Sequence, residues 1–313
     1  MIQTKPSTRA TRATARVALV TCAELGGLDD DDRLLVDPLA AAGVVAEPVA
    51  WDDPAVDWGG YDLAVLRSAW DYPARRDAFV AWARRVPALA NPADVVAWNT
   101  DKRYLAELAG AGVPVVATEW LAPGTALPRT VDGQVVIKPA VGAGSVDAGR
   151  YDLADPAHHR LAAAHLARLH AAGRTVLVQP YLAAVDTAGE TALLFLGGHY
   201  SHAVRKGPML DGPDGGVRRL YRPETIARCE ASRAELAVAT RALAAVPGGA
   251  DRLLYARVDL IPGDDREPRL VELELTEPSL FLGYADGAAE RFAGAIAARL
   301  RLHTGGDGRR SDP

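Results

Sequence analysis

Short apolar runs alternate with longer helix-like segments along most of the chain, and this alternation constrains the fold more than any other feature. Val17–Val20, Val44–Val49 and Leu63–Leu66 are predicted to be buried strands, with helices over Asp32–Ala42 and Arg76–Val86. Strands that alternate with helices are typical of α/β architecture, in which ligands bind beyond the carboxyl ends of the strands. No apolar run reaches the roughly 18 residues that a membrane span needs.

The remaining two thirds of the chain continue the pattern. A Gly197-Gly198 pair between two apolar runs predicts a β-hairpin. Four histidines of one predicted helix are expected at the surface: His158, His159, His165 and His170. The expected helices are Asp101–Ala109, Pro156–Ala172 and Glu224–Val246, and the expected strands are Val135–Lys138, Thr175–Gln179, Ala192–Leu196, Tyr200–Val204, Tyr255–Ile261 and Arg269–Leu275.

Length and composition predict how the chain is divided. A chain of 313 residues is expected to form two domains, or one with a large insertion, at about 150 residues per domain. Asn91-Pro92 marks a plausible boundary. Residues 1–15 and 304–313 are poor in apolar side chains and are predicted to be disordered.

Charge and cysteine content exclude several classes of protein. With 35 Lys and Arg against 40 Asp and Glu, the net charge is −5. General nucleic-acid binders carry a strong positive surface, so neither nucleic acid nor a membrane is expected as a partner. Cys22 and Cys229 are the two cysteines, and their spacing favours neither a disulfide framework nor a zinc site. A cytoplasmic location is expected.

Two predicted neighbouring strands carry the strongest chemical signal. Arg257 and Asp259 lie on one strand and Glu272 and Glu274 on the next. Because side chains alternate across a strand, the members of each pair share a face. If the strands pair, three carboxylates and a guanidinium converge, and such oxygen ligands suit magnesium. The alternative is that these faces are simply solvated.

A lysine followed by a small-residue loop forms a second candidate site. Lys138 ends a predicted strand, and Gly142, Gly144 and Ser145 follow it. The backbone N–H groups of such a loop can approach phosphates while the ammonium supplies a point charge. The loop is not a Walker loop, and Asp147 breaks the dinucleotide fingerprint GxGxxG. By itself the segment could be an ordinary turn.

Two weaker signals lie at the ends of later strands. The segment holding Gln179, Tyr181 and Leu182 could face an adenine, and Asp186 or Glu190 could bind a ribose. A second pair, Arg205 and Lys206, follows the predicted hairpin strand and could hold phosphoryl oxygens, although such pairs are usually solvated.

Taken in order along the chain, these residues, together with Lys102, resemble the ATP-grasp superfamily. The segment ARVDLIPGDDREPRLVELELTEPS is similar to the metal-binding strand pair of D-alanine–D-alanine ligases and glutathione synthetases. The resemblance implies an α/β fold with an N-terminal open pre-ATP-grasp domain over 16–98. Two ATP-grasp subdomains would follow, one over 99–180 with a lid loop and one over 181–303 with the metal site. Glu274 departs from the pattern, because those families usually have Asn there.

The resemblance also implies roles. Lys102 and Lys138 would contact ATP, while Gln179, Tyr181 and Leu182 would line the adenine pocket. Glu190, or alternatively Asp186, would hold the ribose, with Gly142–Gly149 as the lid loop. Two Mg²⁺ ions would bind the carboxylates of Asp259, Glu272 and Glu274. The charge of the phosphoryl group would be offset by Lys138, Arg205 and Lys206. The guanidinium of Arg257 would face the oxyanion.

Three further segments are similar to cycloserine synthetases, the ATP-grasp cyclo-ligases that act on O-ureido-serine. These segments are RSAWDY (67–72), NTDKRYL (99–105) and ELELTEPSLFL (272–282). The first follows the third strand, where a substrate should sit. Its substrate-binding candidates are Arg67 for a carboxylate, Asp71 for an amine, and the neighbouring Ser68, Trp70 and Tyr72. Alternatively, both aromatic residues are packing residues and the aspartate is a turn or cap.

The expected activity is ATP-dependent formation of a C–N bond on a small amino-acid-like carboxylate, through an acyl phosphate. The most specific expectation is an O-ureido-serine cyclo-ligase. A ligase that joins an amino acid to a separate amine, a kinase using the same cleft, and a non-catalytic nucleotide-binding protein remain alternatives, and the resemblance suggests a homodimer.

Overall fold

The first sheet of the computed structural model is parallel and buried on both faces. The structure describes residues 14–127, 133–216, 220–221 and 225–306 of the chain. The strand order is β2-β1-β3-β4, and the strands are β1 (Ala15–Thr21), β2 (Val44–Ala50), β3 (Leu63–Ser68) and β4 (Leu89–Ala90). Val17–Val20 are completely buried, as a parallel sheet with helices on both sides requires.

The helices around this sheet correct one prediction. They are α1 (Asp30–Arg33), α2 (Val36–Ala41), α3 (Arg76–Ala83) and α4 (Ala93–Asn99). The single helix predicted over Asp32–Ala42 is therefore wrong. Pro38 lacks an N–H group and would clash with the carbonyl of Leu34 inside a continuous helix. In the structure it lies in the first turn of α2, where a proline is tolerated.

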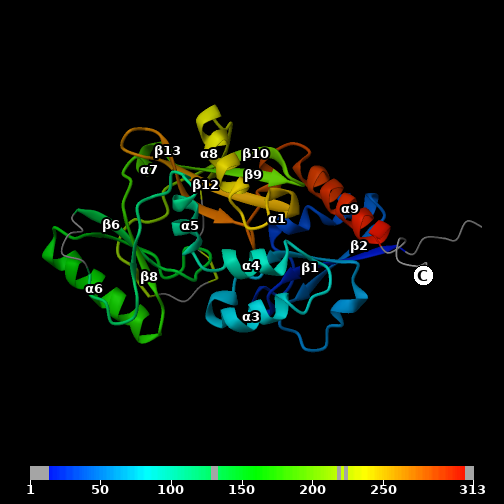
Figure 1. Ribbon diagram of the computed structural model, residues 1–313, viewed down its shortest axis with the longest axis horizontal. Helices are drawn as coiled ribbons and strands as arrows, with labels where there is room; N and C mark the ends of the chain where they lie inside the picture. Colours follow the sequence, from blue (N-terminus) through cyan, green and yellow to red (C-terminus); the bar gives the residue numbers. More distant parts are fainter. Residues whose placement is uncertain (1–13, 128–132, 217–219, 222–224, 307–313) are drawn as a thin grey trace, which may run out of the picture.

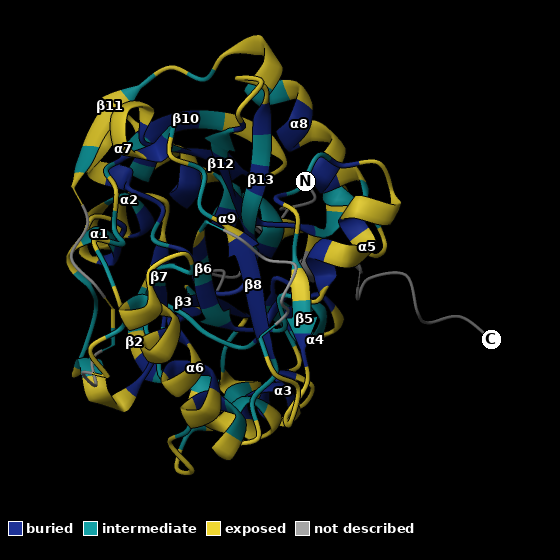
Figure 2. Cartoon of the chain, turned by 90° about the vertical axis from the view of Figure 1, so that its left-hand side faces the viewer, coloured by how far each residue is buried: buried dark blue, intermediate teal, exposed yellow. Residues whose placement is uncertain are grey.

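A second, antiparallel sheet lies at the opposite end of the molecule from the first (Figure 1). Its strand order is β5-β8-β6-β7, with β5 (Glu119–Leu121), β6 (Gln134–Pro139), β7 (Gly149–Asp152) and β8 (Val176–Pro180). The helix α6 (Pro156–Ala171) packs on it and turns its outer face to solvent, while β8 is buried (Figure 2). Strands β5 and β7 were not predicted.

The histidines of α6 do not all lie at the surface. His165 is buried and 4% exposed, so its predicted surface position is wrong. Its Nδ1 lies 2.8 Å from the hydroxyl of Tyr151. The helix face that carries His165 also carries Leu166 and Leu169, which pack against the sheet.

The third sheet is antiparallel and carries the three candidate metal ligands Asp259, Glu272 and Glu274. Its order is β11-β10-β9-β12-β13, with β9 (Glu190–Leu196), β10 (His199–Lys206), β11 (Ile226–Cys229), β12 (Tyr255–Pro262) and β13 (Pro268–Glu274). The hairpin between β9 and β10 is confirmed, because Gly197 and Gly198 join them with φ angles of 59° and 83°. Both glycines adopt the positive φ of a tight hairpin turn.

The helix predicted over Glu224–Val246 is wrong in its first third. Ile226–Cys229 forms the edge strand β11, and the helix α8 spans Arg233–Ala244. Ser232 and Glu235 make a capping box at its start, which satisfies the free N–H groups of the first turn. Glu224 lies outside the described residues.

The chain returns to the first sheet at its end. The helix α9 (Ala288–Gly306) packs Phe292 and Ile296 into the core of that sheet. In the sequence these residues lie within 181–303, the predicted second ATP-grasp subdomain. Both predicted extensions are shorter than expected, because Ala15 belongs to β1 and residues 304–306 continue α9. Residues 1–13 and 307–313 are not described. Within the described residues, no helix is both long and apolar enough to cross a bilayer.

Two short helices and one turn complete the frame of the site. The helices are α5 (Tyr104–Gly110) and α7 (Val185–Ala188), and the turn is η5 (Leu282–Tyr284). The side chain of Asn91, at the predicted domain boundary, joins the first sheet to the third. Its amide donates to the carbonyls of Tyr255 and Leu275 at 2.9 and 2.8 Å, and its oxygen accepts from the N–H of Leu254.

Candidate active site

A cavity of about 650 Å³ is lined by residues of the second and third sheets and by loops and helices next to the first sheet. Many of the residues singled out in the sequence line it, from the first domain, the Gly-rich loop, β8 and the third sheet. These are Trp70, Tyr72, Lys102, Lys138, Gly142, Gly144, Ser145, Gln179, Tyr181, Leu182, Glu190, Lys206, Arg257, Glu272 and Glu274. A concave site with a few converging polar groups is the usual form of a ligand pocket.

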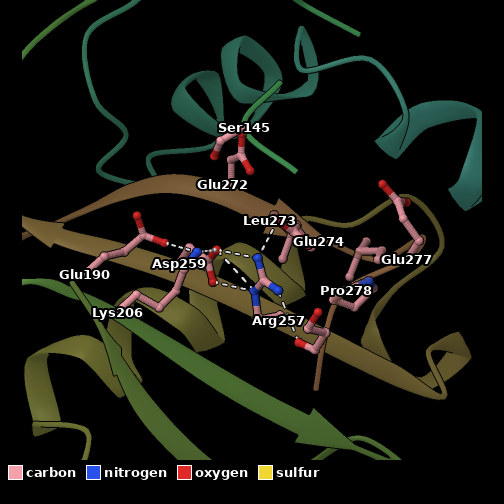
Figure 3. Close-up of polar contacts among 12 residues, drawn as sticks. Ser145, Glu190, Lys206, Arg257, Asp259, Glu272, Leu273, Glu274, Glu277 and Pro278 are labelled. Atoms are coloured by element: carbon pink, nitrogen blue, oxygen red, sulfur yellow. Dashed lines mark hydrogen bonds and ion pairs between the residues drawn. The ribbon is translucent and has the colours of Figure 1, made fainter. Parts of the chain in front are cut away.

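The two strands with alternating charges pair as expected. In the register of β12 and β13, Arg257 faces Glu274 and Asp259 faces Glu272. Oxygens of the three carboxylates lie within 4.8 Å of one another (Figure 3). The antiparallel pairing places alternate residues of both strands on one face, which is why residues up to 17 positions apart in the chain meet. The sheet face that borders the cavity is thus strongly polar. It is not simply a solvent-exposed strand face, which was the alternative interpretation of the sequence.

The charges of this cluster are unevenly compensated. Lys102 and Lys138 lie 3.0 and 3.2 Å from Glu272. Burial raises the pKa of Glu272, but the two ammonium groups outweigh burial and hold that pKa well below its usual range. Burial, with Asp259 and Glu272 close by, raises the pKa of Glu274 to about 8 despite the Arg257 guanidinium.

Asp259 is the most deeply buried member of the cluster, at 1% exposure. Arg257 Nε donates to its Oδ1 at 2.9 Å, and Lys206 Nζ lies 3.2 Å from its Oδ2. Burial raises the pKa of Asp259, and both cations lower it further than burial raises it. Three carboxylates this close repel one another, and a divalent cation bound between them would relieve that repulsion. Their oxygens therefore fit a magnesium ion.

The Gly-rich loop between β6 and β7 lies close to a second segment. A Cβ added at Gly144, whose φ is +58°, would lie 2.5 Å from the carbonyl oxygen of Leu220 and 2.7 Å from the Cα of Tyr221. Lys102 Nζ donates to the carbonyl of Gly142 at 3.0 Å. Glycine at position 144 is therefore required by both the backbone angle and the close approach.

Glu190 and Asp186, the two candidates for binding the ribose, differ in their position relative to the cavity. Glu190 lines the cavity and lies 2.7 Å from Lys206 Nζ, whereas Asp186 accepts a hydrogen bond from Tyr181 at 2.5 Å and does not line the cavity. Burial raises the pKa of Glu190 to about 7, against the lowering effect of Lys206. On the same wall, Gln179 is 3% exposed and donates to Thr118 Oγ1 at 3.0 Å.

Arg205 and Lys206 point to opposite sides of β10. Lys206 enters the cavity, while Arg205 Nη1 donates to the carbonyl of Ala188 at 2.9 Å and Arg205 does not line the cavity. This follows from the alternation of side chains along a strand, which places neighbours on opposite faces. The structure therefore does not bring Arg205 to the phosphoryl position expected of it.

The segment RSAWDY is only partly at the cavity. Arg67, 1% exposed, donates from Nε to Asp32 at 2.7 Å and from Nη2 to the carbonyl of Pro278 at 2.9 Å. Ser68 hydrogen-bonds to the same Asp32. Asp71 accepts a hydrogen bond from Trp51 Nε1 at 2.8 Å and pairs with an arginine of its own domain.

Arg67, Ser68 and Asp71 thus have partners within the protein, and none of the three lines the cavity. Trp70 and Tyr72 line the cavity as expected. Trp70 Nε1 donates to the carbonyl of Glu277 at 3.0 Å, and its ring packs on Tyr221 with centroids 5.1 Å apart.

Two carboxylates at this end of the cavity were not predicted. Asp31 accepts hydrogen bonds from the N–H groups of Leu280 and Leu282 at 2.9 and 2.5 Å. Glu277 lines the cavity next to Tyr72. The run of four aspartates at 29–32 was a readable signal for the first. The second, Glu277, lies in ELELTEPSLFL, three residues after the alternating Glu272 and Glu274.

Comparison with known proteins agrees with this geometry. Residues 17–93 match a family described as the N-terminal domain of the D-cycloserine synthetase DcsG. The cycloserine biosynthesis protein DcsG of Streptomyces lavendulae is 42% identical over 302 residues, which cover 91% of this chain and 99% of that protein. The crystal structure of D-cycloserine synthetase DcsG superposes with a TM-score of 0.79 at 39% identity, covering 91% of this chain and 100% of the other.

More distant structures share the fold alone. D-alanine–D-alanine ligase of Bacillus anthracis, complexed with ATP, has a TM-score of 0.65 at 15% identity over 94% of this chain and 99% of its own. The ATP-grasp ligase PsnB, complexed with a precursor variant, Mg and ADP, has a TM-score of 0.59 at 20% identity over 93% and 99%. The fold is that of an ATP-grasp ligase. Within that class, the chain belongs to the family of the cycloserine biosynthesis protein DcsG.

Proposed function

We propose that this ATP-grasp ligase converts O-ureido-serine to cycloserine in a magnesium-dependent reaction that consumes ATP. One observation carries the proposal. Glu272 and Glu274 line one cavity with Lys102, Lys138 and Lys206, and the buried Asp259 completes their carboxylate cluster, within a chain that matches DcsG along nearly its whole length. Such a site can hold a polyphosphate and its metal next to a carboxylate substrate.

The nucleotide would occupy the side of the cavity formed by β8 and the Gly-rich loop. Gln179, Tyr181 and Leu182 line that side and would face the adenine, with Glu190 on the ribose. Lys102 and Lys138 would bind phosphate oxygens, as would the loop with Gly142, Gly144 and Ser145. The loop 142–149 is our candidate for the lid, and the domain limits 16–98, 99–180 and 181–303 are part of the same proposal.

The metal would be held by Asp259, Glu272 and Glu274, and we propose two ions. When bound, magnesium supplies a Lewis acid that draws electron density from the transferring phosphoryl group. Lys138 and Lys206 add fixed positive charge beside the phosphoryl oxygens. A substrate carboxylate oxygen then attacks the γ-phosphorus, and ADP leaves with the electron pair of the broken P–O bond.

Ring closure needs an acyl carbon that a nitrogen can attack. The nitrogen bonded to oxygen in O-ureido-serine adds to the acyl phosphate carbon, phosphate leaves, and the nitrogen gives up its proton. Arg257, with 5% exposure, faces the cavity and would stabilise the oxyanion of the tetrahedral intermediate. Water subsequently removes the carbamoyl group as carbamic acid. Until ring closure, a closed lid must keep water from the acyl phosphate.

The test measures ADP and phosphate release across a panel of amino acids and O-substituted serines, with product mass spectrometry and with magnesium omitted as a control. Release with O-ureido-serine and the mass of cycloserine would support the proposal. Release only when a separate amine is added would replace ring closure with intermolecular ligation. A phosphorylated acid that accumulates without an amine would favour a kinase, and ATP binding without any release would favour a nucleotide-binding protein.

Two further expectations belong to the same proposal. Both cysteines of the chain are free, with Cys22 buried, which agrees with a reducing cytoplasmic environment. A homodimer is expected, and light scattering coupled to size-exclusion chromatography would give about twice the 33.1 kDa mass of the chain.

A further inference from the structure

The carboxylate of Glu277 differs from the other glutamates of the cavity in having no cation partner. Glu190 pairs with Lys206, Glu272 with two lysines and Glu274 with Arg257. Among the described residues, no side-chain nitrogen of Lys, Arg or His lies within 4.0 Å of the Glu277 carboxylate. A buried carboxylate without a cation is costly, and this one is 9% exposed and borders the cavity.

The first domain holds the backbone at Glu277 through two hydrogen bonds. Trp70 Nε1 donates to its carbonyl at 3.0 Å, and Arg67 Nη2 donates to the next carbonyl, that of Pro278, at 2.9 Å. Tyr72 lines the same cavity, and its hydroxyl lowers the pKa of the Glu277 carboxyl. Burial raises the pKa of Glu277 to about 7, against the lowering effects of Lys102 and this hydroxyl. A carboxylate fixed by buried neighbours is preorganised for a ligand.

Glu277 also lies at a suitable place relative to Arg257. Arg257 Nη1 donates to the carbonyl of Ser279 at 3.1 Å, two residues beyond Glu277. Figure 3 shows Glu277 on the side of Arg257 away from Lys206 and Glu190. In an α-amino acid the nitrogen and the carboxyl carbon are about 2.5 Å apart. A substrate whose carboxylate lies by Arg257 therefore presents its ammonium group to a neighbouring part of the cavity wall.

We propose that Glu277 binds the α-ammonium group of the substrate and selects amino acids over plain carboxylic acids. Tyr72 is the positioning residue that orients the carboxylate. This inference rests on the proposed function and adds the group that recognises the amine, in the role that the sequence suggested for Asp71. Asp71 cannot fill that role because its oxygens accept hydrogen bonds from Trp51 and Arg75 inside the first domain.

The experiment compares two substrates on three proteins. ADP release is measured with O-ureido-serine and with its des-amino analogue, 3-(ureidooxy)propanoic acid, on the wild type, Glu277→Gln and Glu267→Gln. Glu267 is an exposed carboxylate in the β12–β13 turn and serves as the matched control. We expect the wild type and the control to prefer the amino acid by about 10- to 100-fold in kcat/KM, the range of a charge-assisted hydrogen bond.

In Glu277→Gln this preference should fall to less than about 3-fold, mainly through a higher KM for O-ureido-serine, while the KM for ATP stays unchanged. A variant that keeps the preference, or that loses activity equally on both substrates, overturns the inference and leaves the proposed function standing. A wild type that releases no ADP with any acid overturns the proposed function and this inference with it.

A second variant guards against loss of folding. Tyr72→Phe keeps the ring and removes only the hydroxyl, so it should reduce the preference to an intermediate value without changing the melting temperature by more than a few degrees. An unchanged preference in Tyr72→Phe, together with a Glu277→Gln protein that does not fold, would overturn the assignment of Glu277.

Discussion

Arg257 and Glu274 face each other across β12 and β13, and the guanidinium Nη2 lies 2.5 Å from the Glu274 carboxylate. The same guanidinium also holds Asp259. In the free protein, four cations thus pair with four carboxylates, all of which except Asp259 line the cavity: Lys102, Lys138, Lys206 and Arg257 with Glu190, Asp259, Glu272 and Glu274. A polyphosphate that takes over the lysines would leave the carboxylates in excess, so nucleotide and metal should bind together.

Replacing Glu274 by Asn tests the departure from the usual ATP-grasp pattern. The Asn variant retains an oxygen ligand but cannot supply the negative charge of an ionised Glu274, so we expect turnover to persist while magnesium binds more weakly. The magnesium concentration for half-maximal ADP release should rise by about 10-fold, which corresponds to about 1.4 kcal/mol. The measurement is a magnesium titration at saturating ATP. An unchanged midpoint would show that the extra charge does not contribute to metal binding.

Lys138 is expected to act as a point charge on the nucleotide phosphates. Lys138→Ala should lower kcat/KM for ATP by about 10- to 100-fold, the range of a hydrogen bond to a charged group. Lys138→Arg should not restore activity, because the planar guanidinium is larger than the ammonium and the site is 12% exposed. Initial rates at varied ATP give both values. Full activity in either variant would contradict this role.

The paired strands of the site could be predicted because their information is local. Arg257 and Asp259 alternate with apolar residues on one strand, and Glu272 and Glu274 do so on the next. A short turn joins the two, so pairing follows almost from spacing alone. The capping box Ser232–Glu235 is equally local, and it marks the start of α8 in the sequence.

The substrate end of the cavity could not be predicted in the same way. Arg67 follows an apolar strand, and an arginine at a strand end usually suggests a ligand site in this architecture. Its partner Asp32 lies 35 positions away on α1, and Pro278 lies 211 positions away. Arg67 is buried and paired within the protein because α1 and the segment 277–282 pack on β3. The local sequence around Arg67 does not contain this information.

This buried position of Arg67 predicts a loss of stability rather than of substrate affinity. Arg67→Ala would leave Asp32 buried without its cation, which typically costs about 3–5 kcal/mol. Arg75→Ala is the matched control, because its ion pairs are 46% exposed on the arginine side and such pairs contribute about 1 kcal/mol or less. Urea unfolding measures both. If Arg67→Ala unfolds like the wild type and raises only the KM for the acid, Arg67 binds substrate after all.

Gly144 gives the sharpest test of the Gly-rich loop as a lid. Gly144→Ala would bring a Cβ to 2.5 Å from the carbonyl of Leu220, so the loop must move away from the segment at 220–221. Gly173→Ala is the control, since Gly173 has a similar φ of +72° and no atom within 4 Å of the added Cβ. Both variants carry the same backbone cost, about 1–2 kcal/mol, and only the first disturbs the loop contact.

We expect Gly144→Ala to slow product formation by about 10- to 100-fold, because displaced loops misalign reacting groups. ADP release should fall less, since an open lid lets water hydrolyse the acyl phosphate before the nitrogen attacks. The ratio of cycloserine to ADP therefore drops in Gly144→Ala and stays at the wild-type value in Gly173→Ala. Equal ratios in all three proteins would mean that this loop does not keep water from the intermediate, and that the protection comes from another part of the cavity wall.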